Sequence, residues 1–191
     1  FTGAEHGILP CKAIAHSVTK YGRGMILRAK SKIENHPVWG KMGCVCIYGD
    51  TDSVFIKIPR TLVNGDTRQE LMDNAHQMGE RMAGELTTMY LPPNKLEYEK
   101  SYDSFLLLSK KRYAGYKYEP GLPPTLQVKG LECARRDYAP ITVDTQKAML
   151  KALVQDQDRD KAIRIVDETV QRLFTNKIPL EKLIMSKKLS R

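Results

Sequence analysis

Two carboxylates placed two residues apart are the part of this sequence best suited to chemistry. Asp50 and Asp52 stand in the run Tyr48-Gly49-Asp50-Thr51-Asp52-Ser53, between two apolar stretches. Burying negative charge on a turn between strands is costly unless a positive charge compensates it. Mg²⁺ is a suitable counter-ion because it takes oxygen ligands, usually one or two carboxylates plus substrate phosphates. The run therefore predicts a magnesium site, and Gly49 is interpreted as easing a sharp turn or a close approach to substrate.

The elements around this run predict a β-hairpin between two helices. Cys44–Tyr48 and Val54–Ile58 are short apolar stretches joined by a turn of small and acidic residues, and Pro59 ends the second. Residues 10–35 have apolar side chains at helical spacing, which predicts a long helix. Thr67 and Glu70 form a capping box that begins a second helix. The methionines of that second helix are expected to lie in a core.

The second half of the chain predicts more strands and then helices. Residues 96–99 alternate like a strand with one polar face, residues 105–108 and 113–118 read as further strands, and a last strand ends near Lys129. Helices are expected at 142–154, 160–174 and 180–185. The fold class is therefore α+β: an antiparallel sheet with flanking helices, followed by an incomplete helical part. The change in texture falls between residues 130 and 140.

The composition favours an anionic partner. The formal net charge is +9, and residues 95–191 carry 20 basic and 13 acidic side chains. Such basicity suits nucleic acid or an acidic membrane surface. No apolar run approaches the roughly 20 residues that cross a bilayer, and no signal peptide is visible. Four scattered cysteines without zinc-ligand spacing argue against a zinc site. Because the chain opens without Met, we expect it to be a piece of a longer protein.

A basic cluster stands where two predicted strands meet. Lys110-Lys111-Arg112-Tyr113 follows an apolar stretch and begins the next strand. Basic side chains that contact phosphates release condensed counterions, which gives salt-sensitive affinity independent of base sequence. Such contacts position a duplex without reading its bases. The cluster is therefore predicted to bind the nucleic-acid backbone.

Taken together, these motifs resemble family B DNA polymerases, which include eukaryotic replicative polymerases and those of herpesviruses and other large DNA viruses. The run 48–53 resembles the palm metal-binding motif, and the run 110–113 resembles the primer-template motif. Residues 1–4 resemble the end of the fingers motif, and residues 9–23 the palm helix. Residues 129–137 resemble the start of the thumb in the delta-type branch. The resemblance covers essentially all 191 residues.

The resemblance implies roles for individual residues. Asp52 matches the aspartate that coordinates both catalytic metals, and Asp50 matches its less central acidic neighbour. Glu97 and Glu99 match an acidic pair beside the metal site, with a solvated strand edge as the alternative. Further positions are implied to be neighbours of the nucleotide site (Tyr48, Thr51) or to bind DNA (Lys110, Lys111, Arg112, Tyr113, Lys129, Arg135).

The resemblance also implies an activity and partners. A DNA-directed DNA polymerase joins dNTPs to a primer 3′-hydroxyl on primer-template DNA, using two Mg²⁺ ions. Residues 1–135 would be the C-terminal part of the palm and residues 136–191 the start of the thumb. The expected partners are the remainder of the polymerase chain and a processivity factor, with no membrane partner. The expected location is the nucleus, or the site of viral replication for a viral source.

Some parts of the family pattern are not found in this sequence. The first palm aspartate, the fingers lysine that binds the triphosphate and the exonuclease carboxylates are all absent. The chain alone is therefore expected to be inactive. Two other functions stay open. An Asp-x-Asp run also serves metal-dependent glycosyltransferases, which duplex binding would distinguish, and a non-catalytic DNA-binding relic of a polymerase would be the third possibility.

Overall fold

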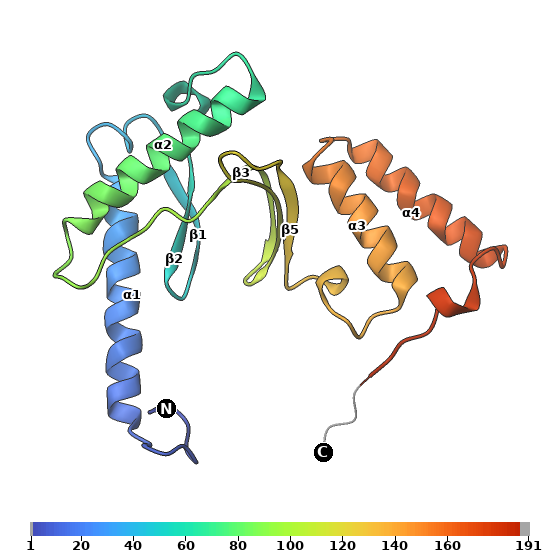
Figure 1. Cartoon of the computed structure of the whole chain (residues 1–191), viewed down its shortest axis with the longest axis horizontal. Helices are drawn as coiled ribbons and strands as arrows, with labels where there is room; N and C mark the ends of the chain where they lie inside the picture. Colours follow the sequence, from blue (N-terminus) through green and yellow to red (C-terminus); the bar gives the residue numbers. More distant parts are fainter. Residues whose placement is uncertain (1, 188–191) are drawn as a thin grey trace. The chain divides into compact units, whose positions relative to one another are not determined.

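The computed structural model describes residues 2–187, so that Phe1 of the predicted fingers motif lies outside the described residues. The chain folds as two compact units, one of residues 1–99 and one of residues 100–191. Figure 1 shows helices and strands in both units. The α+β class predicted from the sequence is confirmed, with α-helices and two small antiparallel sheets.

The first unit is built from a hairpin and two helices. Helix α1 (Lys12–Glu34) precedes strands β1 (Val45–Asp50) and β2 (Ser53–Lys57), which pair antiparallel, and helix α2 (Arg68–Thr87) follows. A two-stranded hairpin is marginal alone and needs another element to cover it. Here Val54 and Ile56 pack against a buried cluster contributed by both helices and the segment between α1 and β1 (Ile33, Trp39, Cys44, Met82, Leu86).

Helix α2 begins as its sequence predicts. The Thr67 hydroxyl accepts a hydrogen bond from the Glu70 N–H at 3.2 Å, and the Glu70 carboxylate accepts one from the Thr67 N–H at 3.4 Å. This reciprocal cap satisfies two of the N–H groups that the first turn leaves without partners, and losing such a cap typically costs about 1 kcal/mol. Met82 is 1% exposed, which confirms a core role.

The second unit is a three-stranded sheet with helices. Strands β3 (Ser101–Ser109), β4 (Arg112–Tyr118) and β5 (Thr125–Lys129) pair antiparallel in the order β3-β4-β5. Helices α3 (Pro140–Val154) and α4 (Arg159–Phe174) follow and lie side by side (Figure 1). Sheet and helix α3 share a buried cluster (Ala114, Leu131, Cys133, Leu150, Val154). The division at residue 99 is one of compactness, and the division into palm and thumb at 135/136 stays a prediction.

Two predicted elements are wrong. Residues 96–99 form no strand, because the backbone N–H of Leu96 donates to the Thr87 hydroxyl at 2.9 Å and its carbonyl accepts from that hydroxyl at 2.9 Å. A side chain of α2 thus takes the hydrogen bonds that a neighbouring strand would offer. The helix expected at 180–185 is only a 3₁₀ turn, Leu180–Lys182.

No helix within residues 2–187 combines the length and the apolar composition required to cross a bilayer.

Candidate functional site

The hairpin tip that carries the two aspartates is unusually tight. Asp50 pairs with Ser53, which leaves Thr51 and Asp52 as the turn. The Asp52 N–H donates to the Asp50 carbonyl at 2.5 Å, a three-residue γ-turn with Thr51 at its centre. Thr51 has φ +50°, a region that β-branched residues rarely adopt and that costs about 1–3 kcal/mol. The chain therefore stores backbone strain at the tip.

The two carboxylates have different surroundings. Asp52 is exposed at the tip, and Asp50, the last residue of β1, is half-buried. One Asp50 carboxylate oxygen accepts a hydrogen bond from the Thr51 hydroxyl at 3.2 Å. The Ser53 hydroxyl donates to the Asp50 carbonyl at 3.1 Å. The expectation that both carboxylates need compensation for burial is therefore wrong for Asp52, which water solvates.

Two other predicted neighbours lie on the same hairpin. The Tyr48 and Phe55 rings are in tilted contact across the two strands, with centroids 5.2 Å apart. Gly49 lies in the extended strand β1, paired with Val54, and a Cβ there would meet other atoms only at 3.6 Å or more. The turn role expected for Gly49 is therefore wrong. A close approach to substrate stays a prediction for it.

Glu97 and Glu99 do not lie on a strand that faces the hairpin. Both side chains point outward from the extended segment while Leu96 and Tyr98 are half-buried. Glu97 forms an ion pair with Lys95, and the hydrogen bond from that ammonium lowers the pKa of the Glu97 carboxyl. Glu97 is therefore ionised at neutral pH and already partnered by Lys95, which agrees with the solvated alternative for this residue.

The carboxylates at the tip fit part of a magnesium shell. Two oxygen donors from Asp50 and Asp52 correspond to the one or two carboxylates that Mg²⁺ usually takes from a protein, with waters and phosphates filling the rest. Within residues 2–187, no three His, Cys, Asp or Glu side chains gather as metal ligands. The donor chemistry therefore suits Mg²⁺, and completion of the shell requires groups from elsewhere.

The predicted DNA-binding residues come together in the second unit. Lys110 and Lys111 form the turn between β3 and β4, and Lys111 has φ +63°. Arg112 and Tyr113 begin β4, where Tyr113 pairs with Lys129 of β5. Lys110, Lys111 and Lys129 are exposed. One end of this sheet thus presents several cations, as a surface for phosphates requires.

The two arginines of the predicted set are already paired with acids. Arg112 forms an ion pair with Glu132. Arg135 makes two hydrogen bonds to Asp137, at 3.1 and 2.9 Å, and these bonds lower the pKa of the Asp137 carboxyl. Neither acid was predicted as a site residue. Arg135 and Asp137 stand two residues apart, so charge patterning could have found that pair, whereas Arg112 and Glu132 are distant in sequence.

Comparison with known proteins decides the family. The model of DNA polymerase family B matches residues 1–191, the whole chain. The chain belongs to DNA polymerase family B. Among its relatives, a DNA polymerase of Paramecium bursaria Chlorella virus NY2A is 40% identical over 191 residues, 99% of this chain. DNA polymerase delta catalytic subunits of Caenorhabditis elegans and Candida albicans are 37% and 36% identical over all of it.

This family B chain spans about a fifth of the length of these relatives, 20% of the viral polymerase and 18% of each of the two delta subunits. The recognition made from the motifs at 48–53 and 110–113 is confirmed. The relatives include both a viral enzyme and cellular delta subunits, the two sources that the motifs left open.

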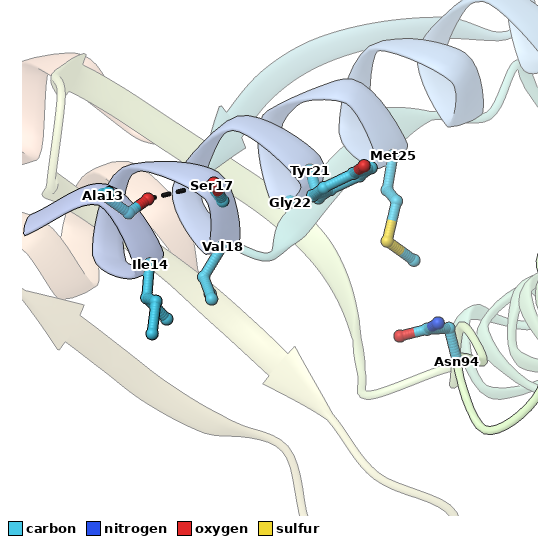
Figure 2. A pocket seen from close by; sticks show the side chains of 8 residues that line it. All are labelled: Ala13, Ile14, Ser17, Val18, Tyr21, Gly22, Met25 and Asn94. Carbon is cyan, nitrogen blue, oxygen red and sulfur yellow. Dashed lines mark hydrogen bonds between the residues drawn. The ribbon is translucent and has the colours of Figure 1, made fainter. Parts of the chain in front are cut away.

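A groove runs along one face of α1 in the first unit. It encloses about 610 Å³. Figure 2 shows side chains of one helix face and Asn94 lining it, and the Ser17 hydroxyl donates to the Ala13 carbonyl at 2.9 Å. No lining side chain is acidic or basic, and most of the lining is apolar (Ala13, Ile14, Ser17, Val18, Tyr21, Gly22, Met25, Asn94).

Proposed function

We propose that this chain supplies part of the active centre of a template-directed DNA polymerase, which joins a dNTP to a primer 3′-hydroxyl and releases pyrophosphate. The observation that carries the proposal is the pair Asp50 and Asp52 on a strained, solvent-accessible hairpin tip in a chain of DNA polymerase family B. Stored strain at such a position is typical of functional sites.

Each residue of the tip has its own part in this chemistry. Asp52, exposed at the turn, would hold both Mg²⁺ ions, and Asp50 would add negative charge beside them. When bound, the ions lower the pKa of the primer hydroxyl and neutralise charge on the triphosphate. The γ-turn orients Asp52 before substrate arrives, so less reorganisation is needed in the reaction. Tyr48 and Thr51 would border the nucleotide, and Glu97 and Glu99 would contribute only a negative field.

The exposed lysines at the β3–β4 turn and at the adjacent end of β5 would hold the primer-template duplex. Lys110, Lys111 and Lys129 suit phosphate contacts, which position DNA of any sequence. Tyr113 would lie beside the primer strand. Arg112 and Arg135 would approach DNA while paired with Glu132 and Asp137, whose negative charges would offset part of their attraction for phosphate.

The wider setting follows from the same proposal. Residues 1–135 would belong to the palm and residues 136–191 to the thumb. The rest of the polymerase chain would supply the first palm aspartate and the fingers, so the 191 residues alone would be inactive. A processivity factor would be a partner, and the nucleus or a viral replication site the location.

The two alternatives receive less support. A glycosyltransferase that uses Asp50 and Asp52 does not need the cationic turn at Lys110 and Lys111. A non-catalytic relic would have no reason to keep both aspartates on a strained turn. Family membership of the whole chain also favours a polymerase over a glycosyltransferase.

Primer extension tests the proposed function directly. We expect the intact protein to extend a primed DNA template when dNTPs and Mg²⁺ are present, and EDTA to abolish extension. The 191-residue chain should retain salt-sensitive duplex binding without extension. Transfer from a nucleotide sugar, with no primer extension by the intact protein, would instead favour the glycosyltransferase, and duplex binding without any extension would favour the relic.

Replacing Lys110 tests whether the β3–β4 turn binds DNA. Lys110 is exposed on the β3–β4 turn and forms no ion pair with another side chain of residues 2–187. We expect Lys110→Ala to weaken primer-template binding equally for all sequences and to reduce the slope of log K against log salt by about one unit. Binding titrations at several salt concentrations with two unrelated duplexes measure both. A loss confined to one duplex would mean base recognition and contradict the proposal.

A further inference from the structure

The ion pair of Arg112 and Glu132 belongs to a longer chain of polar contacts. Glu132 uses its second carboxylate oxygen to accept a hydrogen bond from the Gln146 amide of α3 at 2.8 Å. The Gln146 carbonyl oxygen in turn accepts from the Cys133 N–H at 2.6 Å. The contacts join the first residue of β4, the 3₁₀ turn Glu132–Ala134 and helix α3. We name the residues Arg112, Glu132 and Gln146 the polar clasp.

The polar clasp is anchored in the core of the second unit. Leu131 and Cys133, which flank Glu132, are 0% and 6% exposed, and both belong to the buried cluster that includes Leu150 of α3. The Glu132 side chain itself is 27% exposed and that of Arg112 is 44% exposed. The hydrogen bond from Gln146, together with the charge of Arg112, lowers the pKa of the Glu132 carboxyl. Glu132 is thus an ionised acceptor fixed by buried neighbours.

A second contact couples the same segment to the lysine turn. Gly130 has φ +67°, and a Cβ on it would lie 2.0 Å from the carbonyl oxygen of Lys111 and 3.3 Å from the Cγ of Arg112. The backbone leading into Glu132 therefore lies directly against the backbone of the β3–β4 turn. Only glycine fits this contact. Movement of Gly130 or Glu132 would displace the turn that carries Lys110 and Lys111.

We infer that Arg112, Glu132 and Gln146 are positioning residues that hold the Lys110–Lys111 turn for DNA, and that Arg112 itself does not neutralise a phosphate. The inference rests on the proposed function, in which that turn binds primer-template DNA. Its physical basis is that the charge of Arg112 is offset by its ion pair with Glu132, and that a fixed turn presents its lysines at a lower entropic cost than a mobile one.

The positioning role and direct phosphate contact by Arg112 predict opposite changes in DNA affinity when Glu132 loses its charge. If Arg112 contacted a phosphate, Glu132→Gln would release it and remove a negative charge, and DNA binding would tighten. If the polar clasp positions the turn, Glu132→Gln weakens primer-template binding about threefold to tenfold despite the more positive net charge, since a partly buried charge pair is lost. Glu181→Gln, an exposed acid of the Leu180–Lys182 turn with the same change of charge, is the control.

The experiment is a double-mutant cycle of Arg112→Met and Glu132→Gln in the intact polymerase, read as primer-template affinity against salt. We expect each single variant to weaken binding and the double variant to be no weaker than Arg112→Met alone. We expect the salt slope of Arg112→Met to change by less than half of the roughly 0.9 that one lost phosphate contact removes. Arg112→Lys, which keeps a cation for Glu132, should restore most of the affinity, and thermal unfolding checks that every variant folds.

Three results would overturn the inference: tighter binding by Glu132→Gln, additive losses in the double variant, or a fall of about one unit in the salt slope of Arg112→Met. Lys110→Ala separates this failure from that of the proposed function. If Lys110→Ala leaves both affinity and salt slope unchanged, the β3–β4 turn does not bind DNA and its proposed function fails. If Lys110→Ala behaves as expected while Glu132→Gln tightens binding, only the positioning role is wrong.

Discussion

Substitution of Asp52 by Ala in the intact polymerase is expected to reduce primer extension by about 10³-fold or more, because under the proposed function the transition state would lose a carboxylate that holds the metal ions. Asp52→Asn, which preserves the size of the side chain and removes its charge, should lose a similar factor. Primer-template affinity should change little, since a negatively charged carboxylate does not attract the DNA phosphates. Single-turnover extension and duplex titration measure the two quantities separately.

The matched control is Asp66→Ala, which removes an exposed acid from the loop before α2 in the same compact unit. This variant should keep activity within a factor of two to three of the unmodified enzyme, which is about half a kcal/mol. Extension by Asp52→Ala within tenfold of the unmodified enzyme would remove Asp52 from the catalytic role. A parallel loss of duplex affinity would show instead that the substitution damages the hairpin.

Local patterns predicted the elements whose reasons are local. The hairpin of β1 and β2 follows from two apolar stretches, a short turn and Pro59. The start of α2 follows from Thr67 and Glu70 three residues apart, which satisfy each other's backbone groups. Lys110 to Tyr113 could be placed at a strand junction for the same reason. In each of these cases, residues only a few positions apart were enough to predict the element.

Contacts between distant residues account for what the patterns missed. Residues 96–99 alternate like a strand, yet pairing needs a partner edge, and the hydroxyl of Thr87 occupies the Leu96 backbone instead. The commitment of Arg112 to Glu132 depends on a fold that brings positions 20 residues apart together. The positive φ of Thr51 depends on the register of Asp50 with Ser53, which the composition of the turn does not specify.

The two glycines of α2 should respond in opposite directions to the same substitution. A Cβ on Gly84 would meet no atom within 4 Å, whereas a Cβ on Gly79 would lie 2.3 Å from Cδ2 of the Tyr98 ring. Alanine in a helix is favoured over glycine by about 1 kcal/mol. Gly84→Ala should therefore raise the free energy of unfolding by about 0.5–1 kcal/mol. Gly79→Ala should lower it by about 1–2 kcal/mol, because overpacking outweighs the helix propensity.

Urea unfolding of the 191-residue chain followed by tryptophan fluorescence measures both changes, because Trp39 is the sole tryptophan of these 191 residues and is buried in the cluster that α2 helps to form. The Tyr98 ring also packs edge-on against His76 of α2, with centroids 4.7 Å apart, so it fixes the segment that carries Glu97 and Glu99. In a Tyr98→Ala background the obstruction is gone, and Gly79→Ala should become stabilising like Gly84→Ala. Equal stabilisation by both substitutions in the unmodified chain would mean that Tyr98 does not pack on α2, and the placement of Glu97 and Glu99 would then lose its anchor.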